Sequence, residues 1–210
     1  MSTNPQLTYS VGGPNSNFKD LASIDAATLA QGNVTVLVYP GEYAALTSAV
    51  LKDVSFRGMG HQDEIKINGD FTIANTSTGT INFSNMRFVG SASGATANNF
   101  CVEKLGVGLA QLHFQNCVFA NAETAVRSHT SRAEATTAKV VKMEYCHAVT
   151  MNTGIHMNAN IEASFTAFPS GKNYCVPLSG SAPGTTATIR SCVGGANVGN
   201  MTETVESAIS

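Results

Sequence analysis

The sequence predicts an all-β protein: a right-handed parallel β-helix of about six coils, formed by one chain, with a short capping α-helix at its N-terminal end. Two observations predict this fold, a recurring eight-residue phrase and an alternation of apolar and polar residues within each copy. The long copies are INFSNMRF (81–88), LHFQNCVF (112–119), VKMEYCHA (141–148) and IEASFTAF (161–168). Irregular repeats of this kind are typical of solenoids, in which each repeat forms one coil.

The alternation within each copy predicts one short strand followed by a bend. The first three residues are apolar, polar and apolar, which is the period of a strand with one buried face. Two polar residues then permit a bend before a small or sulfur-containing residue turns inward. A helical solenoid is the alternative, but the copies lack apolar residues at i, i+3 and i+4. Stacking of the copies predicts two interior columns: Phe56, Phe83, Phe114, Met143, Ala163 and Ile189, and Met59, Met86, Cys117, Cys146, Thr166 and Cys192.

Three segments are expected along the chain. Residues 1–16 are polar and rich in turn-forming residues, and they predict an N-terminal arm. Residues 17–193 form the β-helix domain, whose first part, 17–31, is a helix that covers the open end of the solenoid. The clearest strand, 34–38, follows this helix. Residues 194–210 have little apolar pattern and predict a C-terminal tail.

The five cysteines are expected to be buried free thiols. A second recurring phrase, NFCV (99–102) and NYCV (173–176), predicts another wall of the same solenoid. Cys117 and Cys146 fall on adjacent coils and could approach bonding distance. The odd number of cysteines and the absence of a secretion signal favour free thiols over a disulfide.

Composition and charge exclude several function classes. Charged residues make up 12% of the chain, about half the usual share of ~25%. The net charge of −2, without a basic run, gives no indication of a nucleic-acid partner. The N-terminus lacks the features of a secretion signal, and no segment is long and apolar enough to span a membrane. We therefore expect no nucleic-acid partner and no membrane partner.

Residues 18–70 resemble the opening of pectinesterases and related pectin-lyase-like proteins. The resemblance rests on SIDAA (23–27), VLVYPGEY (36–43) and FRGMG (56–60). In that family a helix is followed by a strand ending in Pro-Gly-x-Tyr, and then by a Gly-x-Gly turn before the next coil. The resemblance implies the right-handed parallel β-helix, the hand that parallel crossovers adopt.

The catalytic pattern of that family is incomplete here. Pectinesterases carry a Gln-Asp segment and an Asp-Phe-x-x-Gly segment on central coils, with a downstream Arg. In this sequence Gln62 and Asp63 come directly after Gly60, too early for the catalytic wall. Asp-Phe-x-x-Gly is absent, and no Asp follows residue 70. An Asp-based esterase or hydrolase is therefore not expected, and we predict that the protein is not an enzyme.

Three groups of residues could carry chemistry. His61, Asp63 and Glu64 have the side chains of a metal or acid–base site, but a charged turn is the preferred interpretation. His113 and His147 fall between inward positions, so they should face solvent on different columns. A solvated loop is preferred over a binding loop for the third group, which comprises Arg127, His129, Arg132 and Glu134. We assign no catalytic, cofactor-binding or metal-ligating residue, and we expect no cofactor.

Two functions stay open. We favour a non-enzymatic structural protein of a bacteriophage or other viral particle, such as a capsid decoration or cement protein or a fibre or spike module. Its partners would be copies of itself, as a trimer or dimer, and a major capsid or other virion protein. It would assemble in the host cytoplasm and reside in the virion. The alternative is a carbohydrate-active β-helix, such as a polysaccharide lyase, an esterase or a tailspike depolymerase module. Carboxylates clustered on the central coils would favour it, but residues 71–140 contain only Glu103, Glu123 and Glu134.

Overall fold

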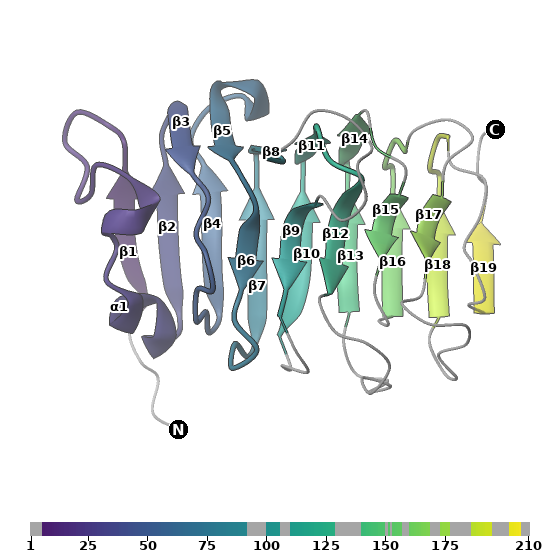
Figure 1. Ribbon diagram of the computed structural model, residues 1–210, viewed down its shortest axis with the longest axis horizontal. Coiled ribbons are helices and arrows are strands. Elements are labelled where there is room, and N and C mark those ends of the chain that lie inside the picture. Colours follow the sequence, from purple (N-terminus) through teal and green to yellow (C-terminus); the bar gives the residue numbers. More distant parts are fainter. Residues whose placement is uncertain are drawn as a thin grey trace.

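The structure is a computed structural model of the 210-residue chain. The residues that it describes are 6–91, 100–105, 110–128, 140–149, 151, 153–156, 160–168, 173–176, 186–194 and 202–206. Within these residues, three parallel sheets surround one apolar interior, and their strands lie side by side along one axis (Figure 1). None of the helices described is long and apolar enough to cross a membrane.

Each sheet collects strands from successive coils. Sheet A has the order β1 (Leu7–Val11), β2 (Val34–Val38), β4 (Val54–Gly58), β7 (Thr80–Ser84), β10 (Gln111–Gln115), β13 (Val140–Glu144), β16 (Asn160–Ser164), β18 (Thr186–Arg190) and β19 (Thr202–Glu206). Sheet B contains β3 (Gly41–Ala44), β5 (Ile65–Asn68), β8 (Arg87–Val89), β11 (Val118–Ala120) and β14 (His147–Val149). Sheet C contains β6 (Phe71–Ile73), β9 (Phe100–Lys104), β12 (Thr124–Ser128), β15 (Thr153–His156) and β17 (Asn173–Val176).

The chain passes through sheets A, B and C in turn and then returns to sheet A one strand further along. For example, β7, β8 and β9 form one coil, and β10 pairs in parallel with β7 to begin the next. This is the predicted parallel β-helix. Among the described residues, four coils contribute a strand to all three sheets, from β4–β6 to β13–β15. A partial coil lies on either side of them, β2–β3 and β16–β17, so the number of coils is close to the six expected.

The predicted bend is a connection of two residues between sheets A and B, the first of which has a left-handed backbone. Asn85 and Asn116 follow β7 and β10 with φ of 56° and 52°, the left-handed conformation that Asn tolerates better than most residues. The Nδ2 of Asn116 donates to Oδ1 of Asn85 at 2.9 Å, so the two turns are also linked through their side chains. Backbone N–H groups complete the turns, since Asn85 donates to the carbonyl of Gln115 at 3.1 Å.

The first predicted interior column is confirmed. Register pairs Phe56 with Phe83, Phe83 with Phe114, and then Phe114, Met143, Ala163 and Ile189 in succession. The Phe83 ring stacks on those of Phe56 and Phe114, with centroid distances of 5.3 and 5.2 Å. Phe88 on sheet B packs edge to face against Phe83 on sheet A, so the aromatic side chains of the two sheets contact each other in the interior. This packing makes the interior a close-fitting aromatic stack in the central coils.

The second predicted column is confirmed except at its first member. Met86, Cys117, Cys146, Thr166 and Cys192 are all buried. Met59 is 42% exposed, so its placement in the column was wrong. The reason is local: after β4 the chain leaves the wall for the 3-10 turn η2 (Gln62–Glu64) before it reaches β5.

The cysteines whose side chains are described are buried free thiols, as predicted: Cys101, Cys117, Cys146 and Cys192. Burial raises the pKa of the Cys101 thiol to about 12, so it stays protonated and unreactive. The side chain of Cys175 lies outside the described residues, although its strand, β17, belongs to sheet C with β9. The second recurring phrase therefore marks another wall, as expected.

The two ends of the chain differ from the expected arm and tail. Part of the arm forms β1, which pairs with β2 as the first strand of sheet A. Part of the tail forms β19, which pairs with β18 as the last. A sheet edge offers unpaired backbone groups, so it can order a segment with few apolar side chains.

The expected capping helix is shorter than residues 17–31. It is divided into a 3-10 turn, η1 (Leu21–Ser23), and α1 (Ala26–Gln31), whose N-terminus is capped by the Asp25 carboxylate. Leu21, Ile24 and Leu29 from this region are buried in the core cluster, which agrees with a covering role at the N-terminal end.

Candidate functional site

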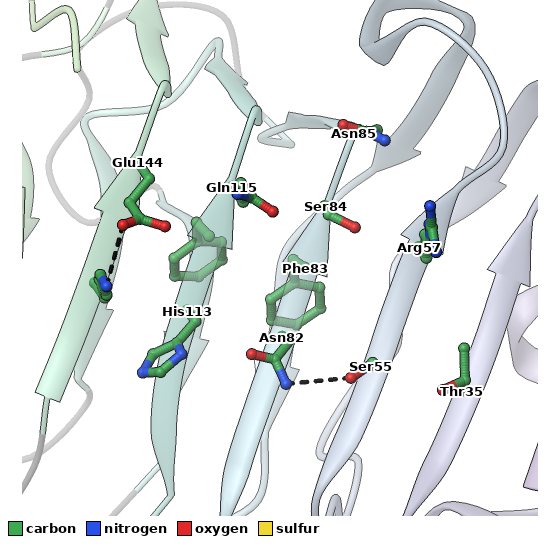
Figure 2. Close-up of a pocket in the computed structure, with 12 residues that line it drawn as sticks. Thr35, Ser55, Arg57, Asn82, Phe83, Ser84, Asn85, His113, Gln115 and Glu144 are labelled. Atoms are coloured by element: carbon green, nitrogen blue, oxygen red, sulfur yellow. Dashed lines mark hydrogen bonds and ion pairs between the residues drawn. The ribbon is translucent and has the colours of Figure 1, made fainter. Parts of the chain in front are cut away.

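The outward side chains of sheet A form two polar rows that cross its strands. Parallel register places equivalent residues about 4.8 Å apart from strand to strand. The first row is Thr35, Ser55, Asn82, His113, Lys142, Glu162 and Thr188, and the second is Leu37, Arg57, Ser84, Gln115, Glu144, Ser164 and Arg190. Figure 2 shows the central members of both rows projecting from neighbouring strands.

A groove runs over these rows. One hollow, with a volume of about 570 Å³, extends from Thr35 on β2 to Glu144 on β13. A second hollow of about 160 Å³ continues to Arg190 on β18, and Lys142 and Glu144 line both. The groove is therefore long, open and polar, and its floor is the hydrogen-bonded sheet.

His113 lines the first hollow from β10, the middle one of the seven strands that the groove crosses (Figure 2). In its row it lies between Asn82 and Lys142. Burial lowers the pKa of its imidazole below the ordinary value of about 6.5, and the nearby Lys142 ammonium lowers it further. Glu144 and Glu162 oppose this effect, but burial dominates. A neutral imidazole at pH 7 can accept a proton, so His113 has the protonation state of a general base.

Lys142 and Glu144 form an ion pair within β13, with 3.0 Å between Nζ and Oε1. Their side chains are 35% and 32% exposed, so both remain accessible from the groove. On the other side of His113, the Nδ2 of Asn82 donates to Oγ of Ser55 at 3.1 Å (Figure 2). The site thus combines a base, a cation, carboxylates and neutral hydrogen-bonding groups on one rigid face.

The second histidine that falls between inward positions of the repeats lies elsewhere. His147 is exposed on β14 of sheet B, whereas His113 is partly buried on sheet A. The expectation that they face outward on different columns is confirmed, and they form no shared site.

His61, Asp63 and Glu64 form a charged turn around η2, as preferred. The Glu64 carboxylate accepts the backbone N–H of His61 at 3.0 Å, which completes a capping box. The Asp63 carboxylate accepts from Arg87 Nη1 at 2.8 Å. These contacts hold the turn against β8, and in the described part of the chain no three His, Cys, Asp or Glu residues form a group able to hold a metal ion.

Arg127 lies in sheet C rather than in a protruding loop. Its Nε donates to Oε1 of the buried Glu103 at 2.8 Å, and its guanidinium lies 4.0 Å from the ring centroid of Phe100. These contacts tie β12 to β9 and give Arg127 a structural role. His129, Arg132 and Glu134 lie outside the described residues.

The sequence interpretation missed the groove because it followed the apolar columns. The signal was present in the same alignment, one position earlier in each copy. Asn82, His113, Lys142 and Glu162 each directly precede an interior residue, so the repeats that predict the interior also predict this outward row.

Comparison with solved structures shows a likeness over the whole chain to the crystal structure of a pectin methylesterase from Aspergillus niger. The match covers 100% of this chain and 70% of that one, with a TM-score of 0.58 and 14% sequence identity. No protein-family model and no curated protein matches the sequence. At this identity the likeness shows the fold alone, and it confirms the right-handed parallel β-helix.

The expectation that the protein is not an enzyme is contradicted by this comparison, because the solved structure that the whole chain matches is an enzyme. That expectation relied on the missing Asp segments, and it gave no weight to the titratable side chains on the outer face of sheet A.

Proposed function

We propose that the protein is a carbohydrate-active β-helix that binds an acidic polysaccharide along the groove of sheet A, with His113 as its general base. The observation that carries the proposal is the partly buried His113, whose pKa is lowered by burial, in a hollow of about 570 Å³ lined by hydrogen-bonding side chains. Large, open sites with a few convergent polar groups and one group of perturbed pKa are the usual positions of binding and catalysis.

The shape of the groove suits an extended chain ligand. Its two hollows lie end to end across β2 to β18, seven strands of sheet A. Six strand spacings amount to about 29 Å, which is enough for several sugar units in a row. Ser55, Asn82, Ser84 and Gln115 offer hydroxyl and amide groups that can bond sugar hydroxyls.

The charges favour an acidic sugar at the catalytic centre. Arg57 and Lys142 line the first hollow on either side of His113, and Glu144, which also lines it, pairs with Lys142. A substrate carboxylate between the two cations would meet the positive charge of Arg57 and would compete with Glu144 for Lys142. His113 would accept a proton from the substrate or from an attacking water, while the Lys142 ammonium stabilises the negative charge that develops. The comparison with a pectin methylesterase supports a polymer of this chemical class.

The test uses pectin, polygalacturonate and the neutral polymer dextran. Wild-type protein should bind the two acidic polymers and release methanol from pectin or shorten its chains, and dextran should bind weakly. His113→Gln should lower turnover about 100-fold or more while binding is retained. His147→Gln is the matched control, because His147 is exposed on sheet B away from the groove, and it should leave turnover unchanged. Failure of the wild type to bind either acidic polymer would overturn the proposal, as would full activity of His113→Gln.

A second proposal is assembly with copies of the chain or with a viral shell protein, as the sequence first suggested. The observation that favours it is that β1 and β19 are the outermost strands of sheet A among the described residues. The free edge of such a strand can pair with another chain. The virion location and a trimeric or dimeric state belong to this proposal. Sedimentation of the purified protein, and its presence in or absence from particles, tests it directly.

A further inference from the structure

Two exposed aromatic rings stand together at the border of the groove. Tyr145 and Phe165 are 58% and 56% exposed, yet their rings lie parallel, with centroids 5.0 Å apart and an interplanar angle of 5°. They are the first residues of the turns after β13 and β16, directly beyond Glu144 and Ser164. Glu144 lines both hollows and Ser164 lines the second, so each ring lies one residue beyond the lining of the groove. The equivalent turn residue of an earlier coil, Asn85, lines the first hollow itself.

The backbone at both rings is unfavourable for an aromatic residue. Tyr145 and Phe165 have φ of 53° and 49°, the left-handed region in which bulky side chains are outliers. The equivalent turns of the preceding coils hold Asn85 and Asn116, which suit this conformation and hydrogen-bond each other. The fold therefore has no need of aromatic residues there, and exposed rings recover little of the local strain through burial. Strain of this kind concentrates at binding sites.

The stack also leaves one ring face available. The residue in register with Phe165 in the next coil is Ser191. The carbonyl oxygen of Arg190, which precedes Ser191, accepts the backbone N–H of Phe165 at 3.0 Å. A serine side chain cannot cover a phenyl ring, and Phe165 is accordingly exposed over more than half its surface. A further ring stacked on Phe165 would lie level with the next strand, about 4.8 Å away. This spacing leaves room for one ring.

We propose that Tyr145 and Phe165 form a stacking platform for a pyranose ring of the bound polysaccharide, which packs its apolar C–H face on Phe165 above Ser191. This inference rests on the proposed function and adds a second contact point to the same groove. A sugar fits the surroundings because its hydroxyl edge would face the polar groups of Ser164 and Arg190 while its apolar face meets the ring. Two rings flanked by polar residues form a small apolar patch, which favours a sugar over a protein helix.

The test compares wild type with the double variant Tyr145→Asn/Phe165→Asn, using polygalacturonate oligosaccharides and isothermal titration calorimetry. Asparagine suits both turns and would extend the Asn85–Asn116 ladder, so the variant should fold with an equal or higher melting temperature. Its affinity for the oligosaccharides should fall about tenfold through loss of stacking, and Phe165→Tyr should retain wild-type affinity.

The outcomes separate this inference from the proposed function. Equal affinity of wild type and double variant overturns the platform and leaves the groove intact. A markedly lower melting temperature of the double variant would show that the rings serve the fold, which also overturns the platform. Loss of self-association, measured by sedimentation without any change in sugar affinity, would assign the rings to a second copy instead. If the wild type itself binds none of the oligosaccharides, the proposed function fails and the platform fails with it.

Discussion

At the scale of single residues, the interior of the central coils depends on stacked phenylalanines. Phe114 is 1% exposed and contacts Phe83, Phe88 and Phe119 through its ring. Phe114→Ala should lower the free energy of unfolding by about 3–5 kcal/mol, because the small side chain leaves a cavity that rigid sheets cannot close. Chemical denaturation measures this change. Gln115→Ala, at the next and outward position, should stay within about 0.5 kcal/mol; equal effects of the two changes would show that the inward face is assigned wrongly.

His113 gives the proposed reaction a defined pH dependence. Its pKa is lowered in the folded protein, mainly by burial, so the neutral base predominates from pH 6.5 upward. Turnover should therefore be constant near pH 7 and should fall on the acidic side, at a pH below about 6.5. A pH–rate profile of kcat/KM measures this, because kcat/KM reports the ionisation of the free enzyme. An inflection above pH 6.5 would contradict the assigned role of His113.

The lowered pKa of His113 also makes the free energy of unfolding depend on pH in a defined direction. The unfolded chain binds a proton at His113 at a higher pH than the folded protein does, so the His113 contribution favours the unfolded state increasingly as pH falls below 6.5. This decrease in the free energy of unfolding is complete once the pH lies below the pKa of His113 in the folded protein. The free energy of unfolding therefore changes through His113 only between the two pKa values, and the destabilisation persists at lower pH.

At the scale of elements, the turn between sheets A and B controls how coils stack. Gly58 ends β4, and a Cβ at this position would lie 2.0 Å from the carbonyl oxygen of Asn85 in the next coil. Gly58→Ala should therefore cost about 3 kcal/mol or more, since the clash is with backbone and cannot be relieved by a side-chain rotation. Thermal unfolding checks this. Ser84→Ala, at the outward end of β7, is the control and should melt close to the wild type.

The strands of the central coils could be predicted because each copy of the repeat carries its own register. Phe83, Phe114 and Met143 were aligned correctly from sequence alone. Each is an apolar residue two positions before a turn, and in stacked strands this position faces the interior. Met59 was misplaced because the 3-10 turn η2 follows Gly58 before β5 begins. No local sequence pattern predicted this extra turn. The strands β1 and β19 were missed because their order comes from a neighbouring strand rather than from their own apolar content.

The candidate site was harder to predict than the fold. His113 and Lys142 are 29 residues apart in sequence (142 minus 113) and lie side by side only when the coils are stacked in register. A lowered histidine pKa depends on burial by neighbouring coils, which no single repeat encodes. Tyr145 was counted as part of a polar pair, so its stack with Phe165 went unpredicted.

At the scale of the whole molecule, stability should vary along the solenoid axis. A repeat fold is stabilised by contacts between neighbouring coils, and an end strand has such a neighbour on one side. Amide hydrogens of β10, which pairs with both β7 and β13, should therefore exchange more slowly than those of β1, which pairs with β2. Hydrogen exchange with mass spectrometry resolves the two strands. Faster exchange in β10 would contradict the importance given to the central aromatic stack.

The central claim is that the outer face of sheet A holds a polysaccharide over His113. The most direct measurement is a crystal structure of the protein bound to a polygalacturonate oligosaccharide. The predicted result is a sugar chain lying across β4 to β16, with one sugar beside His113 and Lys142. Ligand bound on sheet B or sheet C with sheet A unoccupied would contradict the claim.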